Sequence, residues 1–163
     1  MTQVLRTVWR ITTRRFAPTA FTGEGAKLYG GRWNPVGQLM VYAAESRSLA
    51  LLEMLVQDEP LRAHYVLIPA HLSSAVSMET LDANALPPQW RTLAGRDILQ
   101  ALGAQWLRQL RSCVLAVPSV VVPAEYNFLI NPLHPDFQYI TLGDVEPLDL
   151  DPRLAQHPQG LEA

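Results

Sequence analysis

The segment from Ala17 to Gly37 constrains the fold more than any other, because it is too rich in turn-forming residues to continue a regular element. Glycine adopts backbone conformations that other residues avoid, and proline and asparagine favour turns. The turn formers are Pro18, Gly23, Gly25, Gly30, Gly31, Asn34, Pro35 and Gly37. The pattern predicts a long, shaped loop, and loops of this kind carry function more often than helices do.

Regular elements are predicted on both sides of this loop. Alternating apolar and polar residues, several of them β-branched, predict a half-buried strand at 7–12 that opens the sheet. A second strand is predicted at 40–44, and Ser46 is a favourable N-cap for a helix from about 48 to 57. Short apolar runs predict further strands at 64–69, 114–117, 120–122 and 139–142.

An amphipathic helix is predicted at about 96–111. Its apolar residues Ile98, Leu102, Trp106 and Leu110 recur every four positions, so this face is expected to pack on the core. Trp106 is therefore expected in the core and not at a ligand site. Because strands and helices alternate irregularly and no segment repeats at a fixed period, the predicted fold class is α+β (mixed α/β).

Length and charge set the broad class of protein. A chain of 163 residues is typical of one compact domain, so residues 1–163 are expected to form a single domain with a frayed tail after Asp151. A net charge of -2 does not supply the basic field that direct nucleic-acid binding needs. Since the chain shows no signal peptide and no apolar run long enough to span a membrane, we expect a cytoplasmic protein.

Metal, disulfide and hydrolase chemistry is not indicated. The lone Cys113 lies in an apolar run and is expected to be buried, and the four histidines lack metal-ligand spacing. The stretch from Gly25 to Arg32 has the first spacing of a phosphate-binding P-loop but lacks its Lys-Ser/Thr pair, and the glycines miss the Rossmann spacing. Ser119 has no histidine or aspartate nearby in a nucleophile-elbow context.

Glu53 is a candidate for chemistry because it lies in an apolar helix. Helical spacing places Leu49 and Leu52 on the same side as its carboxylate. Burying an ionised carboxylate costs several kcal/mol unless it is paired or hydrogen-bonded. Glu53 is therefore either kept for function or held in a structural ion pair, unless this helix face is solvated.

Arg32 is the second candidate, because glycines precede it in Tyr29-Gly-Gly-Arg-Trp-Asn34. The glycines let the backbone approach a ligand closely, and the guanidinium offers a planar fork of donors for phosphate or carboxylate. Alternatively, the arginine ties down its own loop. Tyr29, Trp33 and Tyr42 add aromatic faces that either stack on a flat ring or belong to the core.

Linked motifs run in order along nearly the whole chain. They are Trp9-Arg-Ile11, Gly23-x-Gly25, Tyr29-Gly-Gly-Arg-Trp-Asn-Pro-x-Gly37, Val41-Tyr-Ala-Ala-Glu-Ser46, Leu49-Ala-Leu-Leu-Glu-Met-Leu55, Val117-Pro-Ser119 and Asn127-Phe-Leu-Ile-Asn-Pro-Leu-His-Pro-Asp136. With these motifs the sequence resembles the RES-domain toxins, a family named for an arginine, a glutamate and a serine. Those residues would be Arg32, Glu53 and Ser119, whereas Gln57 stands where the family often has a histidine.

The resemblance implies a fold similar to that of ADP-ribosyltransferases and an activity on NAD+. In such toxins the nicotinamide–ribose bond is cleaved, by phosphorolysis in at least some members, to nicotinamide and ADP-ribose 1''-phosphate. NAD+ and inorganic phosphate would be substrates, and no further cofactor or metal is implied. The implied partner is an Xre-type antitoxin that covers the active site, with room for a toxin homodimer within the complex.

Each candidate residue has a role in this chemistry. Glu53 would stabilise the oxocarbenium-like state, as carboxylates do in glycosidases, and Arg32 would bind the pyrophosphate or the attacking phosphate. Tyr42 would stack on the nicotinamide or orient the ribose, so Arg32, Tyr42 and Glu53 form the expected catalytic set. Tyr29 and Ser119 are expected to bind substrate, Ser119 through its hydroxyl.

Two other functions compete with this hypothesis. An ADP-ribosyltransferase would keep the fold and pass the ribose to a macromolecule instead of phosphate or water. A non-catalytic binding module would hold Arg32 and Glu53 as a buried ion pair, with the glycine-rich loop binding a partner peptide. Water in place of phosphate would make the enzyme an NAD+ glycohydrolase.

Overall fold

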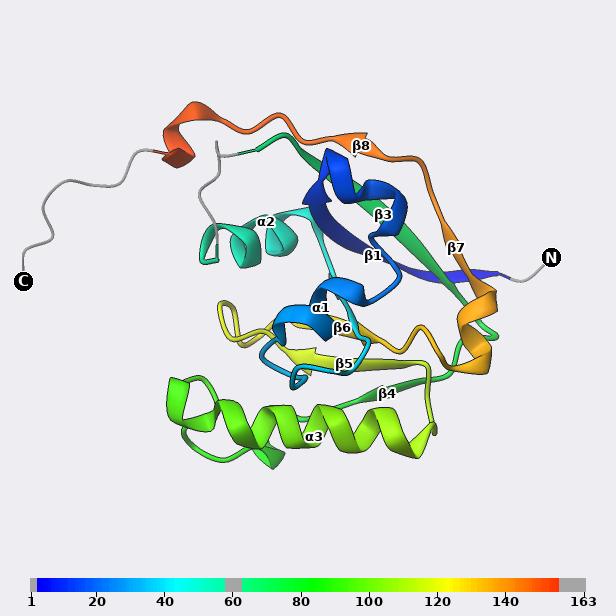
Figure 1. Cartoon of the computed structure of the whole chain (residues 1–163), viewed down its shortest axis with the longest axis vertical. Helices are drawn as coiled ribbons and strands as arrows, with labels where there is room; N and C mark the ends of the chain where they lie inside the picture. The colour runs from blue at the N-terminus through cyan, green and yellow to red at the C-terminus, as the bar shows by residue number, and fades with distance from the viewer. Residues whose placement is uncertain (1–2, 58–62, 156–163) are drawn as a thin grey trace, which may run out of the picture.

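A computed structural model describes residues 3–57 and 63–155, which form a mixed α/β structure around one sheet (Figure 1). In these described ranges the eight-stranded sheet has the order β4-β5-β6-β2-β1-β3-β7, and β8 also pairs with β3. Only β4 and β5 run parallel; the other pairs are antiparallel. The strands are β1 (Val4–Thr13), β2 (Val41–Ala44), β3 (Tyr65–Ser73), β4 (Met78–Thr80), β5 (Val114–Pro118), β6 (Tyr126–Ile130), β7 (Ile140–Leu142) and β8 (Glu146–Pro147).

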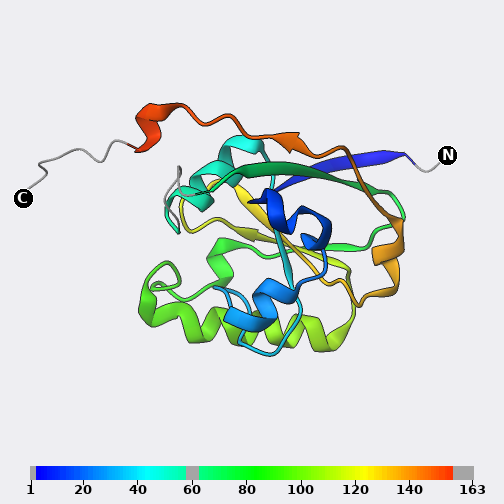
Figure 2. The same ribbon diagram turned by 45° about the horizontal axis from the view of Figure 1, so that its top comes forward.

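Three α-helices accompany the sheet over residues 3–57 and 63–155, and two of them, α2 and α3, pack against it. The α-helices are α1 (Glu24–Tyr29), α2 (Arg47–Leu55) and α3 (Arg96–Gln109). In two views α1 lies between α2 and α3, and α3 runs along the β4 and β5 end of the sheet (Figure 1 and Figure 2). Short 3-10 helices are η1 (Arg14–Thr19), η2 (Ala83–Ala85), η3 (Leu93–Gly95), η4 (Pro135–Tyr139) and η5 (Pro152–Ala155). None of the helices in the described part of the chain is long and apolar enough to cross a membrane.

Alternation along the strands divides the core between the two faces of the sheet. Val8, Val66 and Phe128 belong to a cluster on one face. On the other face, Leu115 and Val117 of β5 pack with α3. A separate cluster on that face joins Leu67 of β3 to Leu49 and Ala50 of α2. Successive side chains of a strand point to opposite faces, which accounts for this division. The face that carries Leu115, Val117 and Leu67 is thus covered by α3 in one place and by α2 in another.

The shortest strand pairing in the sheet is the one between β1 and β2. The register pairs only Trp9 with Ala44, whereas β1 and β3 pair along nearly their whole length. The Arg10 side chain adds a further link by donating from Nη1 to the Tyr42 carbonyl oxygen at 2.9 Å. The boundary between β1 and β2 is thus a seam between two halves of the sheet, joined by one register pair and this bond.

The fold class and most elements confirm the sequence-based predictions. The strands expected at 7–12, 40–44, 64–69, 114–117 and 139–142 correspond to β1, β2, β3, β5 and β7. Ser46 caps α2, its side chain accepting a hydrogen bond from the Leu49 amide at 3.0 Å. Cys113 is buried, and Trp106 lies in the core with 4% of its surface exposed.

Two predictions of local structure are wrong, and three strands were missed. The segment 17–37 contains η1 and α1, the latter bounded by Gly23 and Gly30 at positive φ of 79° and 71°. The strand predicted at 120–122 is absent, because the amides of Val121 and Val122 bond to the Ser119 hydroxyl. The strands β4, β6 and β8 were not predicted. The tail forms η5 up to residue 155, and residues 156–163 lie outside the described ranges.

The buried face of α3 also differs from the predicted one. Ile98 and Leu110 are 46% and 51% exposed, and the helix instead buries Leu99, Gly103 and Trp106 with Ala104. A turn takes 3.6 residues, so a series spaced by four rotates away from its starting face. Apolar residues spaced by four therefore predict the helix correctly, but the residues at the two ends of the series are not on its buried face.

Candidate active site

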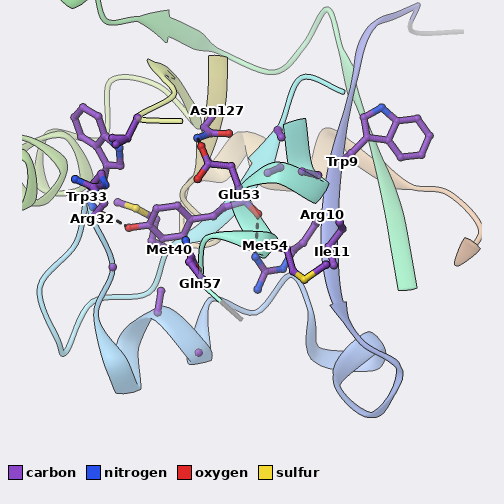
Figure 3. Close-up of a pocket in the computed structure, with 18 of the residues that line it drawn as sticks. Trp9, Arg10, Ile11, Arg32, Trp33, Met40, Glu53, Met54, Gln57 and Asn127 are labelled. Atoms are coloured by element: carbon purple, nitrogen blue, oxygen red, sulfur yellow. Dashed lines mark hydrogen bonds between the residues drawn. The ribbon is translucent and has the colours of Figure 1, made fainter. Parts of the chain in front are cut away.

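A cavity of about 430 Å³ lies at the seam of the sheet, between α2 and the loop that follows α1. β1 and β2 line its floor, while α1, the 30–33 loop, α2 and the start of β6 form its walls. The charged side chains lining it within the described ranges are Arg10, Arg32 and Glu53 (Figure 3). The aromatic side chains lining it are Trp9, Tyr29, Trp33 and Tyr42. The cavity therefore brings together cations, a carboxylate and flat rings.

Glu53 lies on the same side of α2 as Leu49 and Ala50, four and three positions earlier, which are buried against β1 and β3. The side of α2 that faces the sheet therefore carries the carboxylate to the cavity wall. The Glu53 Oε1 accepts one hydrogen bond from the Ser119 hydroxyl and another from Asn127 Nδ2, each at 2.6 Å. No donor to its Oε2 is found among the described residues, so one carboxylate oxygen is held while the other remains for a ligand.

Ser119 lies behind Glu53 and does not line the cavity. Its side chain is fully buried, and its hydroxyl accepts from the amides of Val121 and Val122 at 3.1 and 3.0 Å while donating to Glu53. The sequence analysis expected this hydroxyl to bind substrate. In this structure the hydroxyl's proton is donated to the carboxylate, so Ser119 positions Glu53. Its binding of substrate stays a prediction.

Replacing Ser119 by alanine should lower the free energy of unfolding by about 1–3 kcal/mol, because the Val121 and Val122 amides would lose a buried acceptor. Urea denaturation followed by circular dichroism measures the change. Ser48→Ala is the matched control on exposed α2 surface and should change stability by less than about 0.5 kcal/mol. Equal stabilities of the two variants would show that the Ser119 hydroxyl holds nothing in place.

Tyr42 lines the cavity with its ring but turns its hydroxyl into the loop. The hydroxyl donates to Asn34 Oδ1 at 2.6 Å and accepts from the Trp33 amide at 3.1 Å. Burial raises the pKa of the Tyr42 phenol well above its usual value, so the group stays neutral. The ring is thus free to contact a ligand, and the hydroxyl holds the loop that carries Arg32.

Asn34 organises this loop, a role that the sequence analysis did not assign. The side chain is fully buried, and its Nδ2 donates to the carbonyl oxygens of Ala26, Pro35 and Gln38 at 2.9, 3.0 and 3.3 Å. With the bond from Tyr42, one amide therefore joins α1, the loop and β2. The Asn-Pro pair signals a turn, but the long-range contacts of the amide have no signal in the sequence.

Arg32 is positioned by α3 rather than by its own side chain. Gln100 donates to the Gly31 carbonyl oxygen at 2.8 Å, and Gly103 lies directly against the Trp33 backbone. Within residues 3–57 and 63–155 the buried Nη1 of Arg32 has no hydrogen-bond partner, and no ion pair joins Arg32 to Glu53. The guanidinium therefore neither ties down its loop nor neutralises the carboxylate.

Of the remaining residues at the cavity, one was expected from the sequence and two were not. Tyr29, which was expected to bind substrate, lies at the end of α1 on the cavity wall with 82% of its surface exposed. Asn127 and Arg10 line the cavity but were not singled out. Both occupy polar positions of alternating strands, where a side chain facing solvent is the ordinary expectation.

Comparisons with known proteins agree with this fold. The RES domain family model matches residues 7–151. A relative from Sphingobium sp. (strain YBL2), named Prs ADP-ribosylating toxin, is 40% identical over 90% of this chain and 94% of its own. Proteins named Toxin Res from Yersinia enterocolitica and Photorhabdus laumondii are 39% and 35% identical, covering 90% and 91% of this chain and 98% and 97% of theirs. The chain belongs to the RES-domain family.

The fold is also found among solved structures. The crystal structure of the M. tuberculosis MbcT-MbcA toxin-antitoxin complex matches with a TM-score of 0.74 and 19% identity, over 88% of this chain and 84% of that chain. The protein thus shares its fold with a chain of that complex.

Proposed function

We propose that this protein is the toxin of a toxin–antitoxin pair and that it degrades NAD+ by cleaving the nicotinamide–ribose bond. The observation that carries the proposal is the Glu53 carboxylate, held through one oxygen by Ser119 and Asn127 in a cavity that also presents guanidinium groups. The family and the toxin names of its relatives support the toxin role.

The reaction breaks the bond between the ribose C1'' and the nicotinamide nitrogen. The bonding electrons leave with that nitrogen, so neutral nicotinamide departs and positive charge develops on the ribose. Glu53 Oε2 would stabilise this charge electrostatically. An oxygen of hydrogen phosphate then bonds to C1'' and gives ADP-ribose 1''-phosphate. Arg32 would hold a phosphate group, and the rings of Tyr42 and Tyr29 would contact the flat nicotinamide.

A protein partner would control this activity. Free NAD+ breakdown would harm the host, and an antitoxin of the Xre type covering the cavity would prevent it. The likeness in fold to a toxin solved together with its antitoxin supports this part of the proposal. Tyr29, exposed at the cavity wall, would meet such a partner.

The second candidate is transfer of ADP-ribose to a macromolecule. It is favoured by the name of the Sphingobium relative, Prs ADP-ribosylating toxin. Cleavage of the same bond would serve both reactions, and Glu53 would have the same task in each. The two differ in the acceptor that attacks the ribose, so the products distinguish them.

Incubating the purified protein with NAD+, with and without inorganic phosphate, tests the proposal. We expect phosphate-dependent loss of NAD+ and a new sugar-phosphate signal in phosphorus NMR. Release of nicotinamide with free ADP-ribose would identify a glycohydrolase. If NAD+ remains intact in both tubes and labelled NAD+ added to a bacterial lysate modifies a macromolecule, the enzyme is an ADP-ribosyltransferase.

A further inference from the structure

Helix α2 spans the seam between the two halves of the sheet, one made of β4, β5, β6 and β2 and the other of β1, β3, β7 and β8. The helix follows β2 of the first half in the sequence, yet it packs with Leu67 of β3 in the second half. Near its C-terminal end, Glu53 accepts hydrogen bonds from Ser119, which follows β5, and from Asn127 of β6. The carboxylate therefore attaches α2 to the first half.

Arg47, the first residue of α2, attaches the opposite end of the helix to the second half. Its Nε and Nη2 donate to the two carboxylate oxygens of Glu146 in β8, at 3.1 and 2.9 Å. Its guanidinium carbon lies 3.7 Å from the centre of the Trp9 ring in β1. The bonds from Arg47 lower the pKa of the Glu146 carboxyl, which keeps the pair ionised. One side chain thus joins α2, β1 and β8.

These contacts contribute more to direction than to stability. The side chains of Arg47 and Glu146 are 55% and 38% exposed, and exposed ion pairs contribute little to folding. A guanidinium that is stacked on a ring and bonded through two of its nitrogens nevertheless has few alternative positions. Trp9 is also the β1 residue that pairs with Ala44 of β2. Arg47 therefore holds the start of α2 at the seam itself.

We infer that Arg47 and Glu146 are positioning residues, which together with Trp9 fix the direction of α2 and thereby orient the Glu53 carboxylate in the cavity. The role rests on the proposed function, because it concerns the group that would stabilise the charge on the ribose. Ser119 and Asn127 hold Oε1 of Glu53, whereas the direction of the helix determines where Oε2 points.

The two attachment points are well separated on the helix. Arg47 and Glu53 are six residues apart, which is about 9 Å along the axis. In Figure 3 the Trp9 ring and the Glu53 carboxylate point away from each other. Release of the first turn would let α2 tilt about its bonds to Ser119 and Asn127. A displacement of about 1 Å at a catalytic group can cost about a hundredfold in rate, so a small tilt is enough to matter.

Steady-state kinetics of nicotinamide release test this role. We expect Arg47→Gln to lower kcat about tenfold and to change KM by less than about twofold. KM should persist because Arg32 and Tyr42, which would hold the substrate, belong to the 30–33 loop and to β2. Glu146→Gln keeps an acceptor for Arg47 and should lower kcat by about threefold. A residue that serves only stability would leave kcat unchanged in assays well below the unfolding temperature.

Three further variants separate positioning from a general effect of lost charge. Asp151→Asn removes another exposed ion pair, that with Arg153, and should keep the wild-type kcat. Arg47→Lys keeps a cation for the ring and the carboxylate, and its kcat should lie between wild type and Arg47→Gln. In a Glu53→Gln background, Arg47→Gln should cause no further loss, because no carboxylate remains to be oriented. Equal losses in both backgrounds, or a wild-type kcat in Arg47→Gln, overturn the role.

Hydrogen–deuterium exchange tests the same contacts without turnover, so the role and the proposed function can fail separately. Arg47→Gln should speed the exchange of amides throughout 51–55, because a tilted helix loses its packing along its length. Faster exchange confined to the first turn overturns the role. A protein that cleaves no NAD+ but shows the faster exchange across α2 keeps the attachment through Arg47 and loses the proposed function. Cleavage of NAD+ with a wild-type kcat in Arg47→Gln keeps the function and loses the role.

Discussion

Replacing Glu53 by glutamine is expected to lower the rate of NAD+ cleavage by about two to three orders of magnitude. The amide oxygen of glutamine can still accept from Ser119 and Asn127, so the side chain should keep its place. What it loses is the negative charge facing the cavity. The rate of nicotinamide release at saturating NAD+ measures the effect, and thermal unfolding should show little change.

Two further variants make this result specific. Glu53→Asp keeps the charge but withdraws it by one methylene from Ser119 and Asn127, and an activity between wild type and Glu53→Gln is expected. Glu24→Gln removes a carboxylate from the exposed surface of α1 and should behave as wild type. A Glu53→Gln protein as active as wild type would remove this carboxylate from the mechanism.

Replacing Gly103 by alanine is expected to destabilise the protein by about 3 kcal/mol, at the upper end of the usual cost of overpacking. A Cβ at this position would collide with the Trp33 carbonyl oxygen, which is backbone and cannot turn aside. Alanine is favoured over glycine inside a helix by about 1 kcal/mol, which is too little to offset the collision.

The control for this substitution is Gly25→Ala in α1, where an added Cβ meets no atom within 4 Å. It should leave stability unchanged or raise it slightly. Chemical denaturation of both variants gives the comparison. If Gly103→Ala is as stable as Gly25→Ala, α3 does not pack against the Trp33 backbone as closely as described.

The elements of this fold were largely predictable, since strand alternation and the Ser46 cap are local signals that tertiary packing reinforces. The strand predicted at 120–122 failed because a single hydroxyl, that of Ser119, claims two backbone amides. Propensity cannot anticipate such a contact. β6 was missed because Asn127, a polar residue in its sequence, faces a carboxylate from a distant helix.

The candidate site was predictable in composition but not in geometry. Arg32, Tyr42 and Glu53 all line one cavity, and the resemblance brought them forward together. The sequence could not reveal that Ser119 is buried behind Glu53, nor that the Tyr42 hydroxyl is turned away from the cavity. Arg10 was not singled out because its bond to the Tyr42 carbonyl joins two strands far apart in the sequence, and no local pattern signals such a contact.

The seam between β1 and β2 connects the stability of the sheet with ligand binding. The halves of the sheet share a single register pair beside the cavity, and Arg10 helps to join them through the Tyr42 carbonyl. A molecule bound in the cavity would contact both halves, because residues of β1 and β2 line it. Binding of substrate or of a blocking partner would then also raise the free energy of unfolding of the domain.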